Sequence, residues 1–177
     1  MTSGRTKQDL LAASEHLHYE ITMFGVTAQV LTTGAFVGSL AQNAFLESFT
    51  IHTRSLLQFF FPQNPKPDDV IASHYFTGTQ TWVSVAGQSL PPALDQINRR
   101  VGKEIAHLTY ARLQVTPAAK AWNIGQIYGE MGKLIKAFQA GASQDCLGPS
   151  WPRRVITTPA PTATNAITST TSKSDLA

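Results

Sequence analysis

The stretch QNAFLESFTIHTRSLLQFFF, residues 42–61, decides the fold class, because its apolar residues repeat at helical spacing. The apolar residues that share one side of this helix are Phe45, Phe49, Leu56, Leu57 and Phe60. Such a wide, aromatic arc is typical of a central helix that several neighbours cover. Pro62 follows directly and ends the helix, since proline has no backbone N–H to donate.

Three further stretches have helical spacing. From Leu10 to Leu31 the apolar residues alternate four and three positions apart, with Ser14 in the one gap, which predicts a helix packed almost parallel to its neighbours. Pro91 and Pro92 suit the first turn of a third helix. Its inward stripe is Leu94, Ile97, Val101, Ile105 and Leu108. A fourth helix is predicted from Thr116 to Gly141, with an inward stripe of Ile124, Ile127, Met131, Leu134, Ile135 and Phe138.

No stretch alternates with period two, so strands are not expected. We therefore predict an all-α fold, an up-and-down four-helix bundle with a long capped loop between helices two and three. That loop, residues 62–90, is expected to be a lid over the core, pinned by Tyr75, Phe76 and Trp82, rather than a substrate-binding segment. The predicted divisions are a flexible N-terminus (1–8), the helical bundle (9–142) and a disordered tail rich in Thr, Ser and Pro (143–177).

The composition indicates a protein with few surface charges and without disulfides or membrane segments. Of the 177 residues 42% are apolar and only 14% are charged, so we expect a second copy to cover part of the surface. The net charge of +3 permits an acidic partner without requiring one. The single cysteine, Cys146, cannot form an intrachain disulfide, and no run of residues is apolar enough to span a membrane or direct secretion. A cytoplasmic location is therefore expected, with no membrane contact.

The common ligand-binding motifs are absent from the sequence. There is no CxxC, HExxH, GxGxxG or GxxxxGK[ST] spacing, so neither a metal site, a dinucleotide site nor a phosphate-binding loop is predicted. His16 and His18 are not adjacent on the first helix, and no metal site is built from them. We expect no cofactor.

The chemistry-bearing residues gather in NRRVGKEIAHLTYAR, residues 98–112. Seven residues complete nearly two helical turns, so Arg100 and His107 share a face about 10 Å apart along the axis, with Glu104 between them. Glu104 is placed to pair with Arg100 at i,i+4 and with His107 at i,i+3. This pattern fits two interpretations: a catalytic site, or an ion-paired flank at the seam of a bundle or dimer.

The blocks LHYEI (17–21), NAFLESFTIHTRSLLQFFF (43–61) and INRRVGKEIAHLTYAR (97–112) resemble uncharacterised bacterial helical proteins near the HEPN superfamily. Many members of that superfamily carry an arginine, four to six residues, and a histidine. Arg100 and His107 enclose six residues, VGKEIA. The resemblance covers residues 15–140 and implies a helical bundle that acts as a homodimer.

Catalytic members of that superfamily cleave RNA without metal, in toxin–antitoxin and defence systems, so the resemblance implies RNA and an antitoxin-type protein as partners. On this interpretation His107 moves the proton of a ribose 2′-OH and Arg100 stabilises charge on the phosphoryl oxygens. Two residues depart from the active pattern. Val101, where a small polar residue is common, belongs to the core stripe, and the carboxylate of Glu104 would repel a phosphate.

The remaining polar residues are expected to be structural. Asn43, Glu47 and Arg54 form a polar stripe that predicts a network between helices, and His52 is expected to be a packing histidine. Arg112 is expected to reach a carboxylate such as Glu20 or Glu47. Glycines that merely met water would weaken the fourth helix, so Gly125, Gly129 and Gly132, with Trp122 as an anchor, predict contact with a second copy.

Two alternatives to the nuclease remain open from the sequence. The first is a non-catalytic interaction or oligomerisation module that has kept the bundle and lost the chemistry. The second is a small-molecule binder beneath the loop 62–90, which no motif supports.

Overall fold

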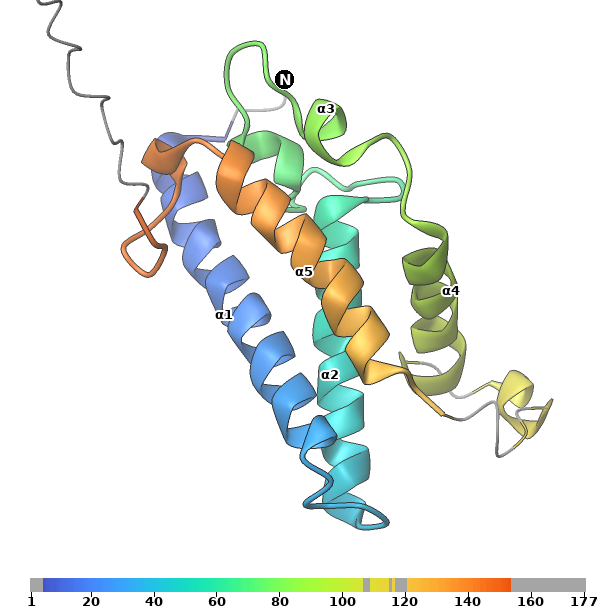
Figure 1. The fold of residues 1–177 in the computed structure, drawn as a ribbon. Helices are drawn as coiled ribbons and strands as arrows, with labels where there is room; N and C mark the ends of the chain where they lie inside the picture. Colours follow the sequence, from blue (N-terminus) through green and yellow to red (C-terminus); the bar gives the residue numbers. More distant parts are fainter. Residues whose placement is uncertain (1–4, 107–108, 115, 117–120, 154–177) are drawn as a thin grey trace, which may run out of the picture.

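The computed structural model describes residues 5–106, 109–114, 116 and 121–153, and these residues form helices and connecting segments without a strand. The all-α prediction is therefore confirmed for the described part of the chain. α1 (Lys7–Thr32) and α2 (Leu40–Phe60) form a hairpin. α5 (Ile124–Gly141) packs on α1, and α4 (Pro92–Arg100) packs on both α2 and α5 (Figure 1).

α1 begins at Lys7, inside the stretch that the sequence predicts to be flexible. Thr6 explains this start: its hydroxyl accepts a hydrogen bond from the Asp9 N–H (3.1 Å), and the Asp9 carboxylate accepts one from the Thr6 N–H (3.0 Å). This reciprocal cap satisfies two backbone donors that would otherwise lack partners. The predicted seam of the helix is confirmed, and its buried residues are Ser14, Leu17, Phe24, Thr27 and Ala28.

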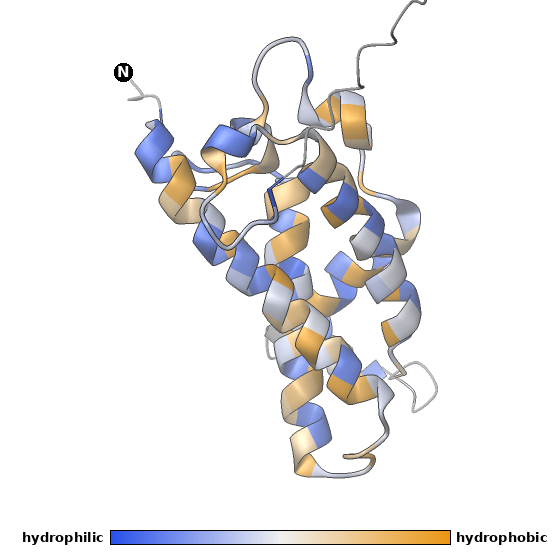
Figure 2. Cartoon of the chain, turned by 60° about the vertical axis from the view of Figure 1, so that its left-hand side comes forward, coloured by the Kyte–Doolittle hydropathy of each residue, from blue (hydrophilic) through white to orange (hydrophobic). Residues whose placement is uncertain are grey.

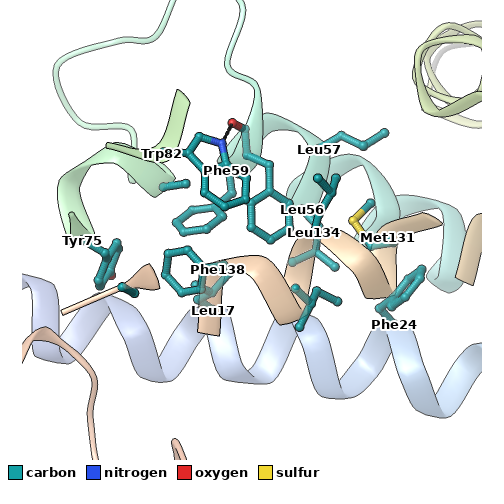
Figure 3. Packing of buried hydrophobic residues seen from close by; sticks show 14 of the residues in the cluster. Leu17, Phe24, Leu56, Leu57, Phe59, Tyr75, Trp82, Met131, Leu134 and Phe138 are labelled. Carbon is teal, nitrogen blue, oxygen red and sulfur yellow. Dashed lines mark hydrogen bonds between the residues drawn. The ribbon is translucent and has the colours of Figure 1, made fainter. Parts of the chain in front are cut away.

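α2 is the central helix that its aromatic arc predicts. It begins after Ser39, whose hydroxyl accepts a hydrogen bond from the Gln42 N–H (3.2 Å), and it ends just before Phe61 and Pro62. Its buried residues are Phe49, Thr50, Thr53, Leu56, Leu57, Phe59 and Phe60. Figure 3 shows several of them packed against Phe138 of α5. Phe45 is the exception, half-buried and in contact with Phe36 at 5.3 Å between ring centroids.

The connection after α2 contains a 3-10 turn, η1 (Ala72–Tyr75), and a short helix, α3 (Trp82–Ala86). Both are pinned to the core, as the sequence predicts. The Trp82 indole N–H donates to the Phe60 carbonyl (2.7 Å; Figure 3). The Tyr75 hydroxyl donates to the Leu10 carbonyl (3.1 Å). Burial, and after it the neighbouring Cys146 thiol, raises the pKa of Tyr75, so its hydroxyl remains a donor.

The third predicted helix is interrupted. α4 ends at Arg100 and passes into a π-helical turn, η2 (Val101–Ala106), and a separate 3-10 turn, η3 (Tyr110–Gln114), follows. Gly102 lies in the π turn, and glycine is a weak helix former. The Thr109 hydroxyl donates to the Lys103 carbonyl (2.8 Å). In a regular α-helix that carbonyl would accept a hydrogen bond from the backbone N–H four residues later. The prediction that one regular α-helix continues beyond Arg100 is therefore wrong.

α5 begins at Ile124, later than the predicted start near Thr116. The Asn123 side chain caps it by accepting a hydrogen bond from the Gln126 N–H (3.0 Å). The predicted inward stripe is confirmed from its second residue onward: Ile127, Met131, Leu134, Ile135 and Phe138 are buried. The helix ends at Gly141, as predicted, where a Cβ would come within 2.5 Å of the Phe76 ring.

Residues 143–153 belong to the folded unit, which corrects the predicted start of the tail at 143. They contain a 3-10 turn, η4 (Gln144–Cys146), and they bury Cys146, Leu147 and Trp151. The compositional bias that predicts disorder is strong only after this segment, which carries its own apolar residues. The rest of the predicted tail, residues 154–177, lies outside the described residues.

The α1–α2 hairpin extends beyond the start of α5 (Figures 1 and 2). We call residues 21–46 the uncharged hairpin end, because this stretch contains no Asp, Glu, Lys, Arg or His. At its tip Val37 and Leu40 are 73% and 84% exposed, and Phe36 is 41% exposed. Among the described residues, no helix has both the length and the apolar content that crossing a membrane requires.

Candidate functional site

Arg100, the arginine of the predicted site, lies at the end of α4 and is paired with Glu104. Its Nε donates to Glu104 Oε1 (2.9 Å) and its Nη2 to Glu104 Oε2 (3.0 Å). The two side chains are only 20% and 18% exposed. This fork-to-fork geometry gives two parallel charge-assisted hydrogen bonds, so the predicted i,i+4 pair is confirmed.

The rest of the Arg100 guanidinium is also engaged with the protein. Its Nη1 donates to the Ala121 carbonyl (3.1 Å), and its Cζ lies 4.0 Å from the centre of the Trp122 ring. Stacking on an indole adds a cation–π attraction to the hydrogen bonds. Arg100 therefore joins α4 and η2 to the segment that leads into α5, and its guanidinium contacts protein groups on its edges and on one face.

This arrangement gives Trp122 a role that the sequence did not predict. The ring is half-buried beneath Arg100. It is thus the stacking partner of Arg100 inside one copy of the chain, and its contact with a second copy stays a prediction.

His107, the proposed general acid or base, lies outside the described residues, and so do Leu108 and the side chain of Arg112. The structure brings together two of the three predicted site residues, Arg100 and Glu104. The face shared by Arg100 and His107 was inferred from α-helical phase, and the π turn over Val101–Ala106 removes that basis.

The polar stripe on α2 does not form the predicted network. Asn43 and Glu47 are exposed, and Arg54 takes part in none of the ion pairs formed among described residues. The tie between α1 and α2 is instead His52, whose Nδ1 lies 2.8 Å from Glu20 Oε2. The prediction that His52 is a satisfied packing histidine is confirmed, and Glu20 has this partner in place of the one proposed for it.

Arg54 reveals a feature that the sequence analysis missed. It lines a cleft of about 590 Å³ together with Asn98 and Gly102 of the α4–η2 segment, and none of the three belongs to the predicted site. The helical repeat places Asn98 and Gly102 four residues apart on one side. The four-residue spacing indicates that Asn98 and Gly102 lie on the same side of the segment. Nothing in the sequence indicates that α2 and residues 62–70 contact that side.

The second exposed feature is a shallow groove between α1 and α5. It has a volume of about 470 Å³ and is lined by Gly25, Val26, Gly125, Tyr128 and neighbouring residues of both helices. Val26 and Tyr128 are 49% and 51% exposed. The predicted glycine face continues along α5, because a Cβ built at Gly129 or at Gly132 meets nothing within 4 Å. The described part of one copy therefore leaves these glycines uncovered.

In the described part of the chain, no group of three or more His, Cys, Asp or Glu side chains is arranged to hold a metal ion. No family model, no curated protein and no solved structure is significantly similar to the chain.

Proposed function

We propose that this chain is a non-catalytic helical module that self-associates, with a HEPN-like, up-and-down arrangement of α1, α2, α4 and α5. The observation that carries the proposal is the engagement of Arg100. Its bonds to Glu104 and Ala121 and its contact with Trp122 fix the guanidinium to the protein. A phosphate would have to displace the Glu104 carboxylate before Arg100 could stabilise the phosphoryl oxygens.

The uncharged hairpin end supports self-association. A surface that contacts only water is normally rich in charged groups, whereas residues 21–46 have none. At the tip, the side chains of Val37 and Leu40 are largely exposed to solvent. Burying apolar area of this kind contributes roughly 25 cal/mol per Å². A second copy of the same uncharged surface introduces no unpaired charge into the interface.

The glycine face of α5 adjoins this surface through the groove beside Gly25 and Gly125. Small residues on facing helices allow their backbones to approach closely, so side chains such as Val26 and Tyr128 can pack into the neighbouring copy. We propose that the dimer interface runs from the hairpin tip along the α1–α5 groove.

Sedimentation equilibrium tests this proposal. We expect wild-type protein to be a dimer at micromolar concentration and Leu40→Lys to be a monomer with unchanged helicity, because a lysine at the tip would be buried without a partner. Val83→Lys is the matched control: Val83 is 48% exposed on α3, away from the hairpin end, and its replacement should leave the dimer intact. A monomeric wild type, or equal effects of the two lysines, would contradict the proposed interface.

A second candidate function is metal-independent RNA cleavage by a homodimer of toxin–antitoxin or defence type, with an antitoxin-type partner. What supports it is the spacing that resembles the HEPN pattern, in which Arg100 and His107 enclose the six residues VGKEIA. Labelled RNA incubated without metal separates the two candidates. Cleavage by wild type that is lost in His107→Ala supports the nuclease, and intact RNA across varied substrates supports the module.

A further inference from the structure

The cleft of about 590 Å³ lies between the second half of α2, the segment that follows α2, and the α4–η2 segment. Its polar lining comes from three separate stretches of the chain and consists chiefly of Arg54, Gln58, Lys66, Asp69 and Asn98. Apolar side chains share the same cleft: Phe61 and Val70 are accessible in it, and the buried Leu57 and Phe59 lie behind them. The cleft therefore presents hydrogen-bond donors and an apolar wall to the same space.

Arg54 is the central group of this cleft. It is half-buried on α2, and it takes part in no ion pair or side-chain hydrogen bond with any described residue. No nitrogen of Arg54 is a buried polar atom without a partner, so the guanidinium remains accessible and can donate to a molecule in the cleft. Arg100 gives the contrast within the same protein, because its guanidinium is matched by Glu104. Arg54 is thus a cation whose acceptor is not supplied by the described part of the chain.

The neighbouring side chains add further donors. Among the described residues, the ammonium group of Lys66 and the amides of Gln58 and Asn98 have no hydrogen-bond partner. Asp69 is the one carboxylate in the lining, and it accepts a hydrogen bond from the Lys66 backbone N–H (2.7 Å). The two cations and one carboxylate leave a net charge of +1, which matches a ligand with a single anionic group.

We propose that this cleft binds a small molecule that carries one carboxylate or phosphate group on an apolar or aromatic body. Arg54 is the principal contact, because its planar fork can donate two parallel hydrogen bonds to an oxyanion. Lys66 adds a point charge, and the amide of Asn98 donates to a remaining oxygen. The apolar body lies against Phe61 and Val70, which are the accessible apolar side chains of the lining. The site is independent of the proposed dimer interface, which involves the opposite end of α2.

Binding is measured by NMR titration of the full chain with benzoate and with phenyl phosphate, and benzyl alcohol is the neutral probe of similar size. We expect saturable shifts at the amides of Gln58, Asp69 and Asn98 with one or both anions, and none with benzyl alcohol. The two anions distinguish a carboxylate ligand from a phosphate ligand. Thermal unfolding gives a second readout, because a ligand that binds the folded state raises the midpoint.

Three variants assign the effect to the cleft. Arg54→Gln should weaken anion binding about tenfold or more, as expected for the loss of a charge-assisted pair of hydrogen bonds. Lys66→Gln should weaken it several-fold, and because Lys66 is exposed in a connecting segment this variant also tests the site if Arg54→Gln does not fold. Lys136→Gln removes one exposed positive charge from α5 and should bind like wild type.

Three results would overturn the proposal. One is wild-type protein that shows no saturable shift with either anion. Another is binding of equal strength in wild type, Arg54→Gln and Lys66→Gln, which would mean that the anions associate with surface charge in general. The third is equal binding of benzyl alcohol and benzoate, which would remove the role of the charged groups.

Discussion

The indole N–H of Trp151 donates a 2.9 Å hydrogen bond to the backbone carbonyl of Ser14, 137 residues earlier in the chain. The Ser14 hydroxyl accepts a second bond from the Gly148 N–H (2.8 Å). One buried serine of α1 thus holds both ends of the segment 148–151. This explains why a hydroxyl occupies the one gap in the apolar seam of α1.

We expect Ser14→Ala to destabilise the fold by about 1–3 kcal/mol, because it leaves the buried Gly148 N–H without an acceptor. Thr22→Ala on the same helix is the control. Its hydroxyl donates only to the His18 carbonyl of its own helix (2.9 Å), so its loss should change the free energy of unfolding much less. Urea denaturation followed by circular dichroism measures both, and equal losses would show that Ser14 has no special role.

Glu15 makes the same junction sensitive to pH. Its carboxylate accepts hydrogen bonds from the Ser150 hydroxyl and from the Ser150 N–H (3.2 Å). The hydroxyl bond is the main cause that lowers the pKa of Glu15 below its usual 4.5. A carboxylate with a lowered folded-state pKa contributes stability that is present above about pH 4.5 and is lost as the pH falls through the folded value.

Ser150→Ala should therefore be less stable than wild type near neutral pH, and the two should converge as the pH falls below 4.5. Chemical denaturation at several pH values measures the difference. A difference that stays constant across this range would mean that the Glu15–Ser150 bonds contribute nothing to the pH dependence. Gly148→Ala should also lower the free energy of unfolding near neutral pH. A Cβ at Gly148 would come within 2.0 Å of the Glu15 carboxylate oxygen and would displace the carboxylate from Ser150.

The Arg100–Glu104 pair should be more strongly coupled than an ordinary surface pair. A double-mutant cycle with Arg100→Met and Glu104→Gln is expected to give a coupling free energy of about 1–2 kcal/mol, because the bonds are bidentate and both side chains are largely buried. The Glu130–Lys133 pair on α5 is the control, since its lysine is 73% exposed, and it should give roughly 0.3 kcal/mol. Similar values for the two pairs would contradict the structural role of Arg100.

His74 predicts a second pH effect, in a higher range. Burial, and after it the charge of Arg5, lowers the pKa of His74 below its usual 6.5. The unfolded chain then binds a proton more readily than the folded chain, so stability should fall as the pH decreases from 6.5 through the folded value. His74→Asn should lose part of this slope between pH 7 and pH 5, and Arg5→Gln should reduce it. Denaturation curves with identical slopes in all three proteins would exclude the effect.

Local patterns predicted the first two helices well. The apolar seam of α1 and the aromatic arc of α2 each bury one face, and the chain supplies clear stop signals such as Pro62. The Arg100–Glu104 pair was also predictable, because i,i+4 spacing needs only one helical turn. These features depend on neighbours within a few residues.

The features that the sequence did not predict depend on contacts between distant segments. The π turn at Val101–Ala106 leaves no mark in the pattern of apolar residues, which still reads as one continuous α-helix. Trp151 lies beside a Thr- and Pro-rich stretch whose composition hides its role, and the partner that makes it structural, Ser14, is in the first helix. The cleft around Arg54 likewise needs three segments that no local spacing connects.

The bond between Ser14 and Trp151 also means that α1 is synthesised well before the residue that covers it. A ribosome adds about 5–20 residues per second, so α1 exists for roughly 7 to 27 seconds before the residue that closes over it is made. Throughout that interval the face of α1 around Ser14 is open, next to the aromatic residues of α2 that are made soon after it. Nascent chains of this protein should therefore engage chaperones that recognise apolar helices, until translation has passed Trp151.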